Sequence, residues 1–306
     1  MLTCDDYLSP KTLDEAFDAM AANSGRYRIV AGATDILPWA REGRAGDVHI
    51  PVLVDIAGIP ELNVREIAGG KARLGAATRF QRFIDDKALA AALPAMPLCA
   101  VWFADDQIRE SATIGGNLVN ASPAADGTPA LLAHDAEVVL ARRNAGRIER
   151  RKLWLAEFVQ GPSKTALRPD EILVEVECAA LPGHGGAFEK VGHRRSLVIS
   201  TVCVAALVEI ASCGDRLADV RLAVAGIGPV PSRMDRIESA LRGKLLTSAL
   251  LEDAASTAAD LVASRTRQEY RREVVQGFVL RALVAAARRA GASDELIPPE
   301  LEAAYA

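Results

Sequence analysis

Residues 112–126 read ATIGGNLVNASPAAD, and the interpretation of the whole chain depends on this stretch. Gly115 and Gly116 allow the backbone to approach a ligand closely, because glycine has no Cβ. Threonine, serine and asparagine side chains, together with free backbone N–H groups, can donate hydrogen bonds to pyrophosphate oxygens. Asp126 closes the stretch with a carboxylate, which accepts hydrogen bonds from ribose hydroxyls. This composition predicts a loop that binds a nucleotide cofactor.

Two turns, at Gly115-Gly116 and Ser122-Pro123, would also explain this composition, with a short strand between them. A second stretch of small residues favours the cofactor interpretation. Ala31-Gly32-Ala33-Thr34-Asp35 follows the predicted strand Tyr27–Val30, and ligands commonly bind where N–H groups are exposed at strand ends. Neither stretch contains the Rossmann or Walker glycine pattern. The two loops therefore indicate a dinucleotide pyrophosphate held by another kind of fold.

Together the two loops resemble those of the FAD-binding medium subunits of molybdenum hydroxylases, the group that includes xanthine dehydrogenase and carbon monoxide dehydrogenase. The resemblance rests on AGATD (31–35), TIGGN (113–117) and SPAAD (122–126), and it continues through WFA (102–104), PDEIL (169–173) and FEKVGHRR (188–195). It implies an α+β fold, in which a two-subdomain FAD-binding region of the vanillyl-alcohol-oxidase (PCMH-like) type precedes a C-terminal antiparallel sheet packed with helices.

The distribution of turn residues divides the chain. The richest linker signal is PGHGG at residues 182–186, because glycine and proline interrupt regular structure. We therefore expect an FAD-binding domain over 1–178, with subdomains of about 1–57 and 58–178. A sheet-plus-helices domain follows over 179–292, and 293–306 form a tail. Strands are predicted at 27–30, 52–55, 64–67, 72–75, 137–141, 147–150 and 173–177, and helices at 129–134 and through most of 236–290.

The resemblance also implies which residues contact FAD. The two loops hold the pyrophosphate, Asp126 contacts the adenosine ribose, Phe103 lies near the adenine, and Leu173 and Ile199 lie near the isoalloxazine. The implied cofactor-binding residues are Val30, Ala31, Gly32, Ala33, Thr34, Asp35, Phe103, Thr113, Gly115, Gly116, Asn117, Asn120, Ser122, Asp126, Leu173 and Lys190. We predict no catalytic and no metal-ligating residue in this chain.

Several of these positions have a plain structural alternative. Asn120 and Ser122 would equally stabilise turns, Phe103 would equally belong to a core, and Lys190 would equally be a surface lysine on a strand. Ala33 stands where the family has a second glycine. Alanine is tolerated there only if its φ is negative, so the contact that Ala33 makes with the cofactor is left open.

The function implied by the resemblance is electron transfer. In the family, a large molybdopterin subunit acts on the substrate, a small subunit with [2Fe–2S] clusters relays single electrons, and the FAD subunit passes them to a terminal acceptor; the complex is a dimer of heterotrimers. One alternative is a stand-alone FAD-dependent oxidase or reductase that binds its substrate directly over the flavin. Another is a flavin-free scaffold that retains the fold. With four histidines and no nucleophile–base constellation, the sequence favours chemistry carried by the cofactor.

Composition excludes other classes of function. The chain has 306 residues, is 50% hydrophobic and has a net charge of −4, which argues for a globular protein and against a nucleic-acid partner. Its apolar stretches are too short for a membrane helix, and the N-terminus does not resemble an export signal. Five scattered cysteines without a Cys-x-x-Cys pair predict no iron–sulfur or zinc site. We expect a cytoplasmic protein.

Overall fold

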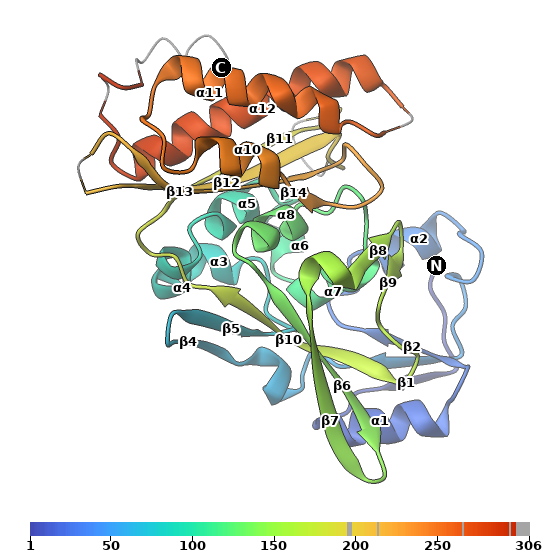
Figure 1. The fold of residues 1–306 in the computed structure, drawn as a ribbon. Coiled ribbons are helices and arrows are strands. Elements are labelled where there is room, and N and C mark those ends of the chain that lie inside the picture. Colours follow the sequence, from blue (N-terminus) through green and yellow to red (C-terminus); the bar gives the residue numbers. More distant parts are fainter. Residues whose placement is uncertain (195–197, 213, 265, 294, 298–306) are drawn as a thin grey trace.

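The computed structural model describes residues 1–194, 198–212, 214–264, 266–293 and 295–297. Its α+β architecture contains a small parallel sheet, a five-stranded antiparallel sheet and a four-stranded antiparallel sheet, as well as a short two-stranded ribbon. In Figure 1 the four-stranded sheet lies between a layer of C-terminal helices and a group of short helices, and the five-stranded sheet lies beyond the short helices. The fold class predicted from the sequence is confirmed.

The N-terminal sheet has three parallel strands in the order β1-β3-β2. Its strands are Asp6–Leu8 (β1), Tyr27–Val30 (β2) and Val52–Asp55 (β3), and its helices are Leu13–Ala22 (α1) and Ile36–Arg41 (α2). Thr12 caps α1, because its side chain accepts a hydrogen bond from the Glu15 N–H at 3.1 Å. The loop predicted at residues 31–35 joins β2 directly to α2.

The five-stranded sheet has the order β4-β5-β10-β6-β7 and is antiparallel throughout. Its strands are Arg65–Ala68 (β4), Lys71–Gly75 (β5), Glu137–Asn144 (β6), Arg147–Trp154 (β7) and Glu171–Ala179 (β10). Gly69 and Gly70 join β4 to β5 with φ values of 58° and 74°, a backbone that favours glycine. Both hairpins predicted from the sequence are confirmed.

Short segments connect the strands of this sheet. The helices are Arg82–Asp85 (α3), Lys87–Ala92 (α4), Met96–Trp102 (α5), Asp106–Arg109 (α6), Ile114–Asn120 (α7), Gly127–Ala133 (α8) and Leu155–Phe158 (α9), with a 3-10 turn at Pro60–Asn63 (η1) and a ribbon of Val159–Gly161 (β8) and Lys164–Thr165 (β9). The prediction of an irregular loop is wrong for residues 114–120, which form α7. The Thr113 side chain caps this helix by accepting from the Gly116 N–H at 3.1 Å.

The C-terminal sheet has the order β11-β12-β13-β14. Its strands are Gly185–Val191 (β11), Val202–Ile210 (β12), Leu217–Ala225 (β13) and Ser232–Arg233 (β14), and its helical segments are Asp235–Leu241 (α10), Ser248–Ser256 (α11), Thr257–Leu261 (η2) and Gln268–Arg289 (α12). Helix α12 contacts β11 and β12, whereas α5 and α8 contact the same sheet from the FAD-binding region (Figure 1). Of the predicted tail, 293–306, residues 294 and 298–306 lie outside the described residues.

One apolar core extends across the predicted domain boundary. It joins side chains from the five-stranded sheet and α5–α8 to Phe188 of β11, to Cys203, Ala205 and Leu207 of β12, and to Ala223 and Ala225 of β13. All six of these C-terminal side chains are 4% exposed or less. The division near residue 179 stays a prediction, because the core that it would cut is continuous.

Candidate functional site

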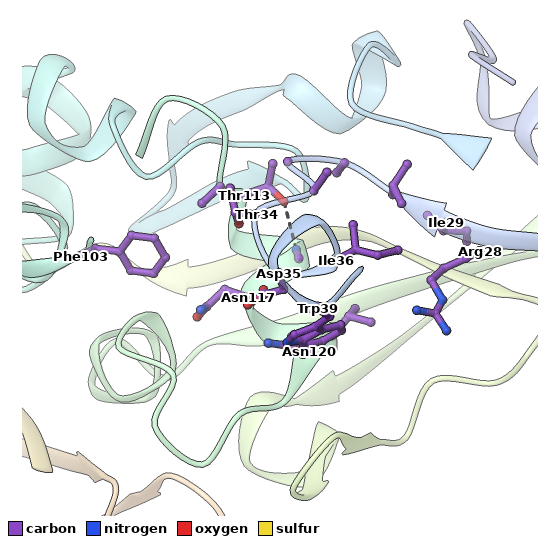
Figure 2. Close-up of a pocket in the computed structure, with 17 residues that line it drawn as sticks. Arg28, Ile29, Thr34, Asp35, Ile36, Trp39, Phe103, Thr113, Asn117 and Asn120 are labelled. Atoms are coloured by element: carbon purple, nitrogen blue, oxygen red, sulfur yellow. Dashed lines mark hydrogen bonds between the residues drawn. The ribbon is translucent and has the colours of Figure 1, made fainter. Parts of the chain in front are cut away.

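Two adjoining cavities lie where the first loop meets α7. The larger has a volume of about 160 Å³ and the smaller about 110 Å³, and both are lined by Ala31, Thr113, Gly116 and Val119. In Figure 2, Phe103 lies at one end of the larger cavity and Arg28 at the other, with Thr113 and Asp35 between them. The two loops predicted to hold one ligand therefore face each other across a single hollow region.

Most of the predicted site residues line these cavities. Eleven of them border the larger cavity, namely Val30, Ala31, Gly32, Ala33, Thr34, Asp35, Phe103, Thr113, Gly116, Asn117 and Asn120. Gly115 and Leu173 border the smaller one. Ser122, Asp126 and Lys190 line neither cavity.

The first loop presents unused hydrogen-bond donors. Within the described part of the chain, no hydrogen bond is recorded for the backbone N–H of Gly32, Ala33, Thr34 or Asp35. Gly32 packs so tightly that a Cβ there would lie 2.1 Å from the Ser111 carbonyl oxygen, so a side chain at 32 would displace the loop. Consecutive free N–H groups form a concave site suited to an anion.

Unlike the first loop, helix α7 has no free N–H groups among the first residues described for it. Its first N–H groups are already used: Ile114 donates to Thr78 O at 2.9 Å, Gly115 to Ala76 O at 2.8 Å and Gly116 to the Thr113 hydroxyl. What α7 offers the cavity is therefore the open face at Gly116 and the side chain of Asn117, whose buried Oδ1 has no hydrogen-bond partner among the described residues. This oxygen faces Gly127, where a Cβ would lie 2.7 Å from it. An amide oxygen accepts hydrogen bonds and does not pair with a phosphate oxygen, so the group of Asn117 that suits a phosphate is its Nδ2 donor.

Asp126 and Lys190 form a buried ion pair beside Trp102, the residue that precedes Phe103 of the larger cavity. Lys190 Nζ donates to Asp126 Oδ2 at 2.5 Å and to the Trp102 carbonyl at 3.1 Å. Ser200 donates to the other carboxylate oxygen, Oδ1, also at 2.5 Å. Burial raises the pKa of Asp126, while Lys190 and the Ser200 hydroxyl oppose that rise. The alternative of a surface lysine is wrong, because the Lys190 side chain is 2% exposed.

The remaining structural alternatives have mixed outcomes. Phe103 stacks on Phe80 with a centroid distance of 3.9 Å and also lines the larger cavity, so it has both a core and a cavity contact. Ser122 accepts from the Ala124 N–H at 3.3 Å, which is a turn interaction. Ile199 is 78% exposed and borders neither cavity.

Comparison with known proteins decides the family. Residues 3–178 match the family model described as the FAD binding domain in molybdopterin dehydrogenase. The chain belongs to this FAD-binding family. Residues 187–286 match the C-terminal domain of the carbon monoxide dehydrogenase flavoprotein. The chain is thus an FAD-binding oxidoreductase subunit of the molybdenum dehydrogenase group.

Individual relatives cover nearly the whole chain. A xanthine dehydrogenase FAD-binding subunit from Escherichia coli is 30% identical over 93% of this chain and 97% of its own length. A glyceraldehyde dehydrogenase medium chain from Sulfolobus acidocaldarius is 27% identical over 90% and 96%. A chain of carbon monoxide dehydrogenase from Hydrogenophaga pseudoflava has a TM-score of 0.84 and 28% identity, covering 94% of this chain and 99% of its own. Names such as medium chain indicate complexes of several chains.

The residues of this family member fit FAD. The N–H groups of residues 32–35, which have no recorded hydrogen bond within the described residues, and the Nδ2 donor of Asn117 suit the charged pyrophosphate. Ile29, Ile56 and Leu173 give the smaller cavity apolar walls. A dinucleotide needs both environments, because its phosphates are charged and its ring systems are largely apolar.

Sequence reasoning missed part of the lining of this FAD-binding family site. The unpredicted residues of the larger cavity are Arg28, Ile29, Ile36, Trp39, Ala112 and Val119. Trp39 lies on α2 three residues after Ile36, so both fall on one helix face. Trp39 could have been predicted as a lining residue, because it is an aromatic residue one helical turn after the glycine-containing loop.

The φ of Ala33 is 55°, so the condition of a negative φ, under which alanine is tolerated at this position, is not met. A non-glycine residue in this left-handed region costs roughly 1 kcal/mol. We expect Ala33→Gly to raise the unfolding free energy of the FAD-loaded protein by about 0.5–1 kcal/mol and to retain FAD. Chemical denaturation with flavin fluorescence would measure it, and a lower stability for the variant would show that the loop is unstrained.

Proposed function

We propose that this chain is the electron-transfer subunit of a molybdenum hydroxylase complex. In this proposal a small subunit with [2Fe–2S] clusters supplies electrons, a large molybdopterin subunit acts on the substrate, and a terminal acceptor takes the electrons. The assembly would be a dimer of heterotrimers in the cytoplasm. None of the helices that the structure describes is long and apolar enough to cross a membrane.

The observation that carries the proposal is that residues 32–35, whose backbone N–H groups have no recorded hydrogen bond within the described residues, line the larger cavity together with Thr113, Gly116 and Asn117. Those groups would bind the pyrophosphate together with Thr34 and Asn117. Asp126 would bind the ribose and Phe103 the adenine, while Leu173 would contact the isoalloxazine. When bound, FAD exchanges electrons singly or in pairs, which suits a relay between one-electron and two-electron partners.

Among the described residues, two of the three ionisable groups that line the cavities are held in ion pairs, whereas burial raises the pKa of the third, Asp35. Among the described residues, Arg28 and Asp35 are the charged side chains that line the larger cavity, and Arg28 is paired with Asp47. Glu171, at the smaller cavity, is held by Arg151 at 2.6 Å, and this hydrogen bond lowers the pKa of Glu171. A carboxylate with a lowered pKa in an ion pair is a poor general base.

Spectroscopy on the purified complex tests the proposal. We expect the complex to contain about one FAD per copy of this chain, and we expect its visible flavin absorbance to bleach when the substrate of the large subunit is added. The isolated chain should bind FAD but should not turn over that substrate. Absence of flavin even after reconstitution would refute the site, and substrate turnover by the chain alone would instead identify a stand-alone flavoenzyme.

A further inference from the structure

Arg271, in the first turn of α12, reaches the adjoining ends of two strands. Its Nη1 donates to the carbonyl oxygens of Thr201, just before β12, and of Gly226, just after β13. Its Nε donates to the Thr266 carbonyl at 2.9 Å. In the described part of the chain, every acceptor recorded for Arg271 is a neutral oxygen. Burial lowers the pKa of this guanidinium, and Arg267 lowers it further.

The two carbonyl groups belong to segments that approach each other closely. Gly226 has a φ of 85°, and a Cβ at this position would lie 2.4 Å from the Thr201 carbonyl oxygen. Carbonyl oxygens that converge repel each other unless a donor lies between them. The guanidinium supplies that donor, and its planar geometry fixes the spacing of the two strand ends.

Both strand ends touch the segment that follows α7. The Gly226 N–H donates to the Pro123 carbonyl at 2.8 Å, so one residue joins Arg271 to the second cofactor stretch. Ser200, adjacent to Thr201, donates to Asp126 Oδ1 at 2.5 Å. Arg271 is therefore connected to Pro123 through one residue, Gly226, and to Asp126 through two, Thr201 and Ser200.

We propose that Arg271 is a positioning residue for FAD: it holds the ends of β12 and β13 so that Gly226 and Ser200 fix Pro123 and Asp126. These two residues close the stretch whose Thr113, Gly116, Asn117 and Asn120 line the larger cavity. This inference rests on the proposed FAD site and assigns to the C-terminal domain a part in cofactor binding. The guanidinium acts through the two strand ends and does not touch the cofactor.

The test compares Arg271→Ala with Arg272→Ala in the intact complex. Arg272 is the exposed neighbour on the same helix, so its variant controls for loss of an arginine from α12. We expect Arg271→Ala to weaken FAD binding at least about tenfold, because the segment 123–126 would no longer be pre-organised. Millimolar guanidinium should restore part of this affinity, whereas an equal concentration of sodium chloride should not. Flavin fluorescence titration measures both effects, and Arg272→Ala should bind FAD like the unmodified chain.

A second variant changes Gly226, whose carbonyl oxygen accepts a hydrogen bond from Arg271. Gly226→Ala leaves the Arg271 side chain intact but pushes the two strand ends apart, and it should weaken FAD binding in the same direction. Retention of full FAD affinity by Arg271→Ala, or a loss that guanidinium does not restore, would overturn the inference. Failure of the unmodified chain to bind FAD would instead overturn the proposed function, so the two failures are distinguishable.

Discussion

Gly116→Val is expected to abolish FAD retention while leaving the fold intact. Gly116 lies in α7 and borders both cavities. A Cβ there would meet the Thr113 hydroxyl oxygen at 3.0 Å and no other recorded atom within 4 Å, so the valine methyl groups would project into the cofactor space. A helix accepts valine at a cost of about 0.5 kcal/mol, whereas a side chain in the pyrophosphate site excludes the ligand. We expect FAD affinity to fall more than about a hundredfold.

The ratio of FAD to protein after purification and reconstitution measures this effect. Gly277→Val is the matched control, because Gly277 is also helical and has open space for a Cβ, but lies on α12 away from both cavities. Gly277→Val should bind FAD normally, and Gly116→Ala should show a smaller loss than Gly116→Val. Stoichiometric FAD in Gly116→Val would place the site elsewhere.

Acid should destabilise the protein through His134, which follows α8 and is 0% exposed. Burial lowers the pKa of His134 from 6.5 to about 3, and its Nε2 has no recorded partner within the described residues. The unfolded chain therefore binds a proton below about pH 6.5 that the folded chain does not bind, so stability falls as pH decreases through this window. The expected loss is about 2 kcal/mol between about pH 7 and pH 5, rising to about 4 kcal/mol near pH 3.

Urea unfolding of the unmodified chain and of His134→Gln at several pH values would isolate this contribution. His134 Nδ1 lies 3.1 Å from the Ala179 carbonyl, and a glutamine amide keeps a donor for it. The Gln variant should lose most of the pH dependence above about pH 5, where few carboxylates titrate. Equal slopes for the two proteins would show that His134 is not responsible.

Local sequence signals predicted the strands and turns of the molecule well. The Gly69-Gly70 turn, the alternating strand of Leu173–Glu177 and the junction of Val30 with the first loop all lie where backbone preference and tertiary structure agree. At two positions the local backbone preference and the tertiary structure disagree, and there the sequence did not predict the observed backbone. Thr113 caps the helix α7, so the glycine-rich stretch that follows it is helical. In the first loop, Gly32 packs against Ser111 and the next residue, Ala33, has a positive φ.

The site needed long-range information that spacing along the chain does not contain. The burial of Lys190 depends on Asp126, which is 64 residues away in the sequence, and on Ser200, which also bonds that carboxylate. Trp39 and Val119 reach the cavity because α2 and α7, which carry them, are brought to the same cavity by the fold. The resemblance implied most of the lining residues, but only packing shows which donors remain free.

The continuous core beneath α5 and α8 has a consequence for cooperativity. Two family models divide this chain, yet the side chains at their junction are packed in one cluster that includes Phe188, Cys203 and Ala223. Separating the two halves would expose this apolar surface to water, at about 25 cal/mol for each Å². Neither half gains its full stability alone, so the two modules should unfold in a single cooperative transition.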